Sequence, residues 1–215
     1  PTQNYGIVSN KGVDGSLTFK QHVGNLNLTF RANYTYAKNK IVETDEIRHK
    51  YSYQDLTGMS LWTPFLYIAD GLYTPDDFNI TVDPVSGAES YQLKSSVADP
   101  GAAVAPGDIK YRDLDRSGFV DQNDVTKVGK SPYPEWTYSL GAAFNYRGFD
   151  FSFLLQGIAG ASFNLLDNAV QTRAFVDNGN VYPIARGAWA YYPEQGIDTR
   201  ATATYPRLTT QSNEN

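Results

Sequence analysis

The sequence contains no cysteine, only two histidines and no long apolar run. The absence of cysteine excludes disulfide scaffolds, zinc–thiolate sites and thiol catalysis. A transmembrane helix is also excluded, because it would need about eighteen or more consecutive apolar residues. His22 and His49 lie in polar segments without the serine or carboxylate pattern of a catalytic triad. We therefore expect two solvated surface histidines, no catalytic residue and no enzyme.

Charge is scarce and mainly acidic. Charged residues make up 19% of the chain, and the formal net charge is −5. Binding to nucleic acid requires a basic surface that neutralises phosphates, so nucleic acid is not an expected partner. The N-terminal segment lacks the charged, apolar and small-residue regions of a secretory signal. We expect the chain to be a fragment or a processed form.

Aromatic residues are abundant, with 16 Tyr and 11 Phe. Such a composition favours β-strands. From Leu26 to Tyr36, apolar or aromatic residues at even positions alternate with polar residues at odd positions. Alternation over about eleven residues is the length that a tilted membrane strand requires. The polar positions include Arg31, which suits a water-filled lumen better than the core of a soluble domain.

This strand completes a predicted hairpin over residues 12–37, with a turn at residues 22–25. A second hairpin is predicted over residues 136–157, with its turn at Arg147-Gly148. Aromatic residues gather toward the strand ends of both hairpins, as in the interfacial girdles of membrane barrels. These residues are Tyr34, Tyr36, Trp136, Tyr138, Tyr146 and Phe149.

The connections between the predicted strands are very unequal in length. The turns are tight, whereas residues 38–135 form one long loop region and residues 158–215 form another. Residues 61–69 are apolar and predict one short strand, which Pro64 restricts to a sheet edge or a bulge. Short turns at one end and long loops at the other are typical of outer-membrane barrels. We predict an all-β chain of antiparallel transmembrane β-barrel strands with long surface loops, as a fragment of a larger barrel.

A second hypothesis stays open, because half-buried strands of soluble sandwiches also alternate. Under this hypothesis the chain is a soluble, extracellular, calcium-stabilised β-module that binds glycan or protein. The two hypotheses differ in the location of the apolar side chains. In a barrel these side chains face outward into lipid, whereas in a soluble module they are buried together between two layers.

The sharpest local motif is an acidic segment over residues 113–124. Oxygen donors occur at the first, third, fifth, ninth and twelfth positions of a calcium-binding loop, and a glycine occupies the sixth, where the chain must bend. The twelfth position holds aspartate rather than the longer glutamate of an EF-hand. The other interpretation is a loop rich in Asx turns that binds no ion. The candidate calcium ligands are Asp113, Asp115, Ser117, Phe119, Asp121 and Asp124.

A calcium ion at this loop would have a structural role, because every ligand position is filled and none is left for catalysis. The sequence predicts no organic cofactor. Substrate-binding residues are not identifiable from the sequence.

Several motifs occur in a fixed order along the chain. Residues 10–12 read NKG, residues 67–72 read YIADGL, residues 106–118 read PGDIKYRDLDRSG, residues 146–150 read YRGFD and residues 205–208 read YPRL. In this order the motifs resemble the C-terminal barrel segment of SusC/RagA-like TonB-dependent outer-membrane transporters. The resemblance extends over nearly the whole chain.

The resemblance implies a large barrel in the cell outer membrane that imports oligosaccharides or peptides. It also implies a SusD-like surface lipoprotein as partner and the TonB complex as the energy source, acting through parts outside this sequence. Arg116-Ser117 departs from the Asn/Asp-Gly neighbourhood usual in the family, which weakens the calcium prediction. Membrane lipid and the remainder of the barrel are further expected partners, because an open sheet edge in lipid leaves backbone groups unpaired.

Overall fold

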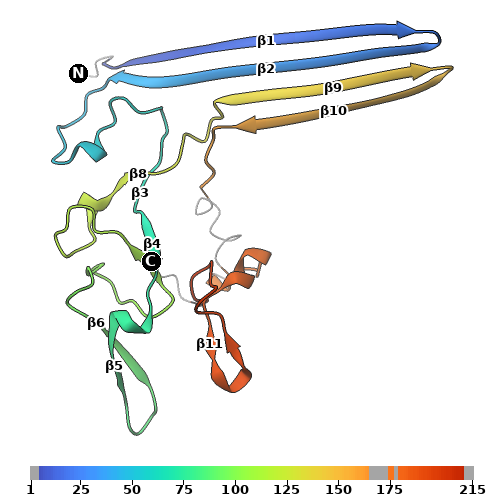
Figure 1. Cartoon of the computed structure of the whole chain (residues 1–215). Coiled ribbons are helices and arrows are strands. Elements are labelled where there is room, and N and C mark those ends of the chain that lie inside the picture. The colour runs from blue at the N-terminus through green and yellow to red at the C-terminus, as the bar shows by residue number, and fades with distance from the viewer. Residues whose placement is uncertain (1–4, 165–173, 177–178, 211–215) are drawn as a thin grey trace. The chain divides into compact units, whose positions relative to one another are not determined.

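The chain divides into two compact units in the computed structural model (Figure 1). The described residues are 5–164, 174–176 and 179–210. The first unit comprises Pro1–Phe65 and Lys127–Phe163, and the second comprises Leu66–Thr126 and Asn164–Asn215. Among the described residues, none of the helices has the length and apolar character needed to span a membrane.

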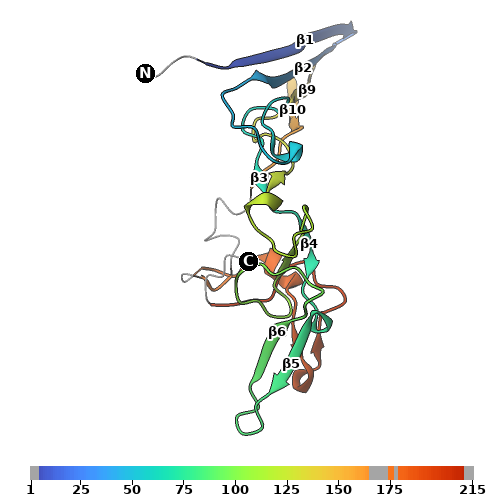
Figure 2. The same ribbon diagram turned by 90° about the vertical axis from the view of Figure 1, so that its left-hand side faces the viewer.

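Four long antiparallel strands form the sheet of the first unit (Figure 1). Their bounds are Ile7–Val23 for β1, Leu26–Glu43 for β2, Trp136–Tyr146 for β9 and Phe149–Ala159 for β10. The strands pair in the order β1-β2-β9-β10, and Figure 2 shows them from the side as one layer. The predicted all-β, antiparallel architecture is confirmed.

Two-residue turns close both hairpins at the same end of this sheet, because Leu26 pairs with Tyr146. Gly24 has a φ of +59°, and Arg147 and Gly148 have φ values of +46° and +89°. Turns with positive φ have the twist that matches paired strands. The long connection after β2 and the chain after β10 leave from the opposite end.

The first hairpin is longer than predicted. β1 begins at Ile7 and β2 ends at Glu43, both outside the range 12–37. The extra pairing was not foreseen because residues 37–40 read AKNK, which breaks the alternation of apolar and polar residues. Backbone pairing needs no apolar side chains and continues through this segment. β9 and β10 occupy the second predicted hairpin, and β10 runs slightly past its end.

The rest of the described chain contains short strands and short 3-10 helices. The strand pairs are β3 (Phe65–Leu66) with β8 (Thr126–Lys127), β4 (Ala69–Leu72) with β7 (Ile109–Tyr111), β5 (Phe78–Val82) with β6 (Glu89–Leu93), and β11 (Tyr191–Tyr192) with β12 (Ile197–Asp198). The 3-10 helices are η1 (Ser52–Gln54), η2 (Pro75–Asp77), η3 (Gln122–Asp124), η6 (Pro183–Gly187) and η7 (Pro193–Gln195).

The single strand predicted over residues 61–69 is wrong. Trp62 has a φ of +63°, which lies outside the extended region, and Pro64 has no amide hydrogen to donate to a ladder. Only the two residues of β3 and the first residue of β4 lie in strands in this segment.

A small apolar core lies in the second unit, within the segment predicted as loop. Tyr73, Phe78 and Val104 are 1%, 3% and 8% exposed, and Leu93 and Val97 pack against them. Burial raises the pKa of the Tyr73 phenol to about 12, because the charged form would lose its hydration. The predicted loop region therefore carries a folded core of its own.

A buried ion pair joins two distant parts of the second unit. The carboxylate of Asp108 is 2% exposed and accepts hydrogen bonds from Nε and Nη2 of Arg207 at 2.6 and 3.1 Å. The amide of Arg207 donates to the carbonyl of Gly107 at 2.8 Å. Gly107 has a φ of +91°, and a Cβ there would lie 2.6 Å from the Trp189 ring. The motifs YPRL and PGDIKY thus pack against each other.

Arg207→Leu should destabilise the second unit, because it removes the guanidinium that pairs with the buried Asp108 carboxylate. Removing one partner of a buried ion pair lowers the free energy of unfolding by about 3 kcal/mol. The loss should be smaller here, because Arg207 is about one-third exposed and solvent screens the pair. The loss of stability is measured as the shift in the thermal unfolding midpoint of the intact protein, with limited proteolysis as the probe of unfolding.

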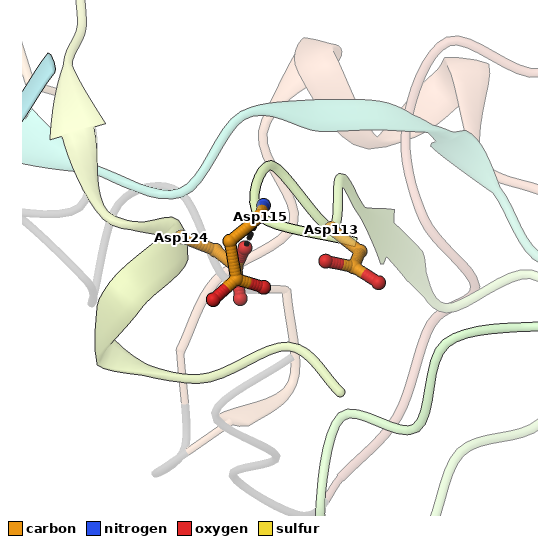
Figure 3. Close-up of side chains that lie close together, drawn as sticks. All are labelled: Asp113, Asp115 and Asp124. Atoms are coloured by element: carbon orange, nitrogen blue, oxygen red, sulfur yellow. Dashed lines mark hydrogen bonds between the residues drawn. The ribbon is translucent and has the colours of Figure 1, made fainter. Parts of the chain in front are cut away.

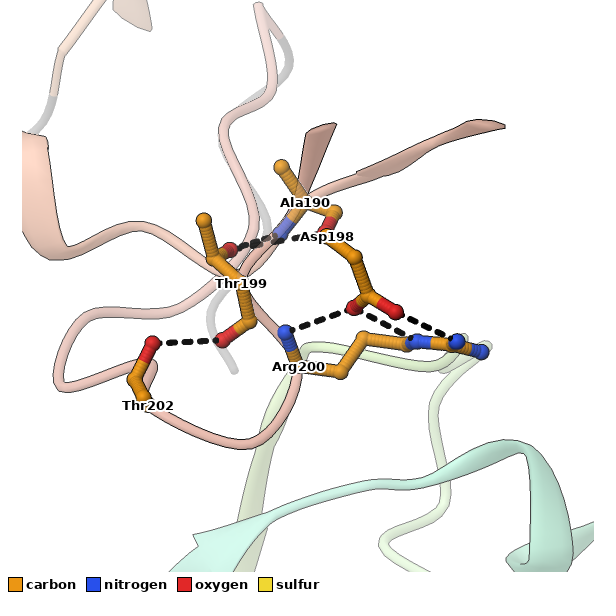
Figure 4. A network of polar contacts seen from close by, with 5 residues as sticks. All are labelled: Ala190, Asp198, Thr199, Arg200 and Thr202. Atoms are coloured by element: carbon orange, nitrogen blue, oxygen red, sulfur yellow. Dashed lines mark hydrogen bonds and ion pairs between the residues drawn. The ribbon is translucent and has the colours of Figure 1, made fainter. Parts of the chain in front are cut away.

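Arg200→Leu is the matched control. Arg200 makes a bidentate pair with Asp198 that is open to solvent (Figure 4). This variant should change the unfolding midpoint little. Equal shifts in the two variants would contradict a stabilising role for the buried pair.

Candidate functional site: a two-faced sheet and an acidic loop

One face of the four-stranded sheet carries six uncharged rows that are apolar except for Gln21. Directly paired residues of antiparallel strands carry their side chains on the same face, so the register defines rows across β1, β2, β9 and β10. From the tight-turn end, these rows are Val23-Leu26-Tyr146-Phe149, Gln21-Leu28-Phe144-Phe151, Phe19-Phe30-Ala142-Phe153, Leu17-Ala32-Leu140-Leu155, Gly15-Tyr34-Tyr138-Gly157 and Val13-Tyr36-Trp136-Ala159. None of these residues is charged.

The opposite face of the same strands is mainly polar. Its rows are His22-Asn27-Asn145-Asp150, Lys20-Thr29-Ala143-Ser152, Thr18-Arg31-Gly141-Leu154, Ser16-Asn33-Ser139-Gln156 and Asp14-Thr35-Thr137-Ile158. Cross-strand hydrogen bonds join side chains on this face, such as Asn33 Nδ2 to Ser139 Oγ at 3.1 Å. The sheet therefore presents one surface suited to an apolar medium and one suited to water.

The apolar rows are exposed rather than buried. Leu17 is 68% exposed, Leu155 is 61% exposed and Phe149 is 80% exposed. Ala142 is the one row residue that is buried. Soluble monomers rarely expose contiguous apolar patches of this kind, so the surface needs an apolar partner.

Aromatic rings cover glycines within one row and fix the register of the sheet. A Cβ on Gly15 would lie 2.7 Å from the ring of Tyr34, and a Cβ on Gly157 would lie 2.5 Å from the ring of Tyr138. An aromatic ring that packs over a glycine on the neighbouring strand favours one pairing over a slipped one. The assignment of side chains to the two faces is therefore well specified.

Both outer strands of the sheet have an open edge. Among the described residues, β1 pairs only with β2, and β10 pairs only with β9. The outward backbone groups of an edge strand can pair with a further strand. The sheet can therefore be extended on both sides.

The acidic loop brings three of the predicted calcium ligands together (Figure 3). Carboxylate oxygens of Asp113, Asp115 and Asp124 lie within 4.8 Å of one another. Asp124 is fully buried, and the other two are half-buried. Such an all-oxygen donor set fits a hard cation such as calcium.

Asp124 also organises the loop without an ion. Its carboxylate accepts hydrogen bonds from the amides of Leu114 at 2.6 Å, Asp115 at 3.3 Å and Asp121 at 2.8 Å. Gly118 has a φ of +85°, which lets the chain reverse between the first and last aspartates. The shorter side chain at the twelfth position thus sits inside the loop.

The other three predicted ligands take part in local hydrogen bonds. The hydroxyl of Ser117 donates to the carbonyl of Phe119 at 3.1 Å. The side chain of Asp121 caps η3 by accepting from the amide of Asn123 at 2.7 Å. Short polar side chains commonly bond to backbone groups close in sequence, which is the competing interpretation of this loop.

Sequence reasoning did not single out three lysines beside the apolar rows. Lys11, Lys38 and Lys40 belong to the longer part of the first hairpin and fall on the face of Tyr36. The spacing of two residues from Tyr36 to Lys38 and Lys40 was available in the sequence as a signal. The signal is weak because residues 38–40 are not apolar on either face, so the alternation stops at Tyr36.

Comparison with known proteins finds similarity of fold. No protein-family model matches the sequence, and no curated protein does. A chain of the RagAB peptide transporter gives a TM-score of 0.54 at 16% identity, with 99% of this chain and 21% of that chain covered. A chain of the RagAB peptide importer in the closed-closed state gives 0.51 at 19% identity, with 99% and 21% covered. This chain thus spans about a fifth of the length of those chains.

Proposed function

We propose that the chain is part of the barrel wall of a TonB-dependent outer-membrane transporter of the SusC/RagA type. One observation carries the proposal: the six rows that all four strands share on one face of the sheet are uncharged and mostly exposed, while the other face is mainly polar. In a membrane barrel the first face meets lipid and the second meets the lumen. The fold similarity to the RagAB peptide transporter supports the same assignment.

The lengths of β9 and β10 agree with this proposal. β9 and β10 contain 11 residues each, and a membrane strand of a barrel needs about 9–11. Tight turns at one end and long connections at the other match the periplasmic and extracellular sides of such a barrel. The open edges of β1 and β10 would pair with further strands, because unpaired backbone groups in lipid cost several kcal/mol each.

The proposed cargo is an oligosaccharide or a peptide. The RagAB structures are described as a peptide transporter and a peptide importer, which favours a peptide. The proposed partners are a SusD-like surface lipoprotein and the TonB complex, in addition to the remainder of the barrel. We assign the chain no catalytic role.

The soluble β-module is the second candidate, and the exposed apolar rows count against it. A soluble sandwich buries such rows between two layers. Leu17, Phe149 and Leu155 are instead among the exposed side chains of the sheet.

Phe153→Arg should destabilise the intact barrel in lipid vesicles. Phe153 lies in a central apolar row, and an arginine near the bilayer midplane costs about 2–4 kcal/mol. Denaturant unfolding in vesicles measures the loss.

Ser152→Arg is the matched control. Ser152 is the adjacent residue on β10 and faces the polar side. An arginine there remains hydrated, so the unfolding midpoint should change little. A larger loss for Ser152→Arg than for Phe153→Arg would contradict the proposed orientation. A folded, detergent-free monomer of the intact protein would contradict the barrel itself.

We also propose that Asp113, Asp115 and Asp124 hold a structural calcium ion. The convergence of three carboxylates within 4.8 Å supports this proposal. Bound calcium would offset the repulsion among these negative charges and keep the loop rigid.

Calcium should raise the thermal midpoint of the intact protein relative to chelator. The combined variant Asp113→Ala and Asp115→Ala should remove this difference. Asp124 is left unchanged because its carboxylate accepts three backbone amides and its loss would perturb the loop even without metal. Identical melting curves with calcium and with chelator in the parent protein would exclude the ion.

A further inference from the structure

Lysines follow the apolar rows directly at the long-loop end of the sheet. The last aromatic row contains Tyr36 and Trp136, whose ring centroids lie 4.4 Å apart. Lys38 is two residues beyond Tyr36 and pairs directly with Lys11. Lys40 is two residues further on the same face. All three lysines are exposed. The row after Val13-Tyr36 on this face is therefore basic, whereas the rows before it are uncharged.

Two of these three lysines have no ion-pair partner among the residues that the structure describes. Like charges directly opposite each other destabilise a strand pair. Glu135 supplies one carboxylate, 2.8 Å from Lys130 Nζ and 3.4 Å from Lys38 Nζ. These two ammonium groups, Lys130 first, hold the pKa of Glu135 below its usual range. Within the described part of the chain, Lys11 and Lys40 have no carboxylate within 4.0 Å.

We propose that Lys11 and Lys40, flanked by Lys38, bind the negatively charged phosphate groups of membrane lipids. The inference rests on the proposed function, because the lysines lie at headgroup level only if the apolar rows face hydrocarbon. Long lysine stems can lie along the apolar surface while the ammonium groups reach the interface. The aromatic row beside them marks the same level, since aromatic girdles sit at membrane–water interfaces.

The test compares two pairs of substitutions in the intact protein. The first pair is Lys11→Gln with Lys40→Gln, and the control pair is Lys20→Gln with Arg31→Gln. Each pair removes one cation from β1 and one from β2, but Lys20 and Arg31 lie on the polar face. Both pairs remove the same amount of charge. A difference between them therefore reports where the cations lie on the sheet, not the net charge of the protein.

Each protein is placed in nanodiscs of phosphatidylcholine with a minor share of phosphatidylglycerol, and retained phosphatidylglycerol is measured by native mass spectrometry. A lysine near an anionic lipid surface changes affinity about fivefold. The Lys11 and Lys40 pair should therefore weaken retention roughly 25-fold, and the control pair should leave it near the parental level. Excess inorganic phosphate should not displace the lipid.

Three results would overturn the proposal. Equal retention in the parent and in the Lys11 and Lys40 variant would exclude these lysines as lipid ligands while leaving the barrel intact. Displacement of phosphatidylglycerol by inorganic phosphate would identify free phosphate as the ligand. Failure of the parent protein to insert into the bilayer at all would overturn the proposed function, and this inference with it.

Discussion

The pairing of backbone groups between antiparallel strands is the constraint on which the sheet depends. Each strand must satisfy its amides and carbonyls through its neighbours, and this pairing fixes which side chains share a face. A slip by one residue would move every aromatic side chain to the polar face. Tyr34 over Gly15 and Tyr138 over Gly157 favour the observed register, as do the two tight turns. The two-faced surface is therefore a consequence of the register.

In the second unit, side chains provide many of the hydrogen bonds that backbone groups require. Its strands are short, so few of its backbone groups are paired in ladders. Side chains replace the ladders: Asp108 accepts from Arg207 and from the amide of Ala105, and Asp124 accepts from three amides of the acidic loop. Buried carboxylates that are fully hydrogen-bonded hold a loop in one conformation.

The sequence predicts the two hairpins well because alternation and tight turns are local signals. Gly24 and the Arg147-Gly148 pair mark the turns, and the even positions from Leu26 to Tyr36 mark one face. The full length of β1 and β2 was not predicted, because residues near their outer ends are polar on both faces and show no alternation. The acidic loop was predicted from spacing, but spacing alone could not tell that Asp121 caps η3 while Asp124 turns inward.

The sequence by itself determined the all-β class, the alternating faces and the positions of the turns, because each depends on residues close together along the chain. The tertiary structure decided which strands are neighbours and which distant residues meet. Leu28 lies beside Phe144, and Asp108 binds Arg207, across separations that no local pattern encodes. Those contacts depend on how the long connections fold back. The continuous apolar surface requires the pairing of β2 with β9, whereas the lysines beyond it lie within the first hairpin alone.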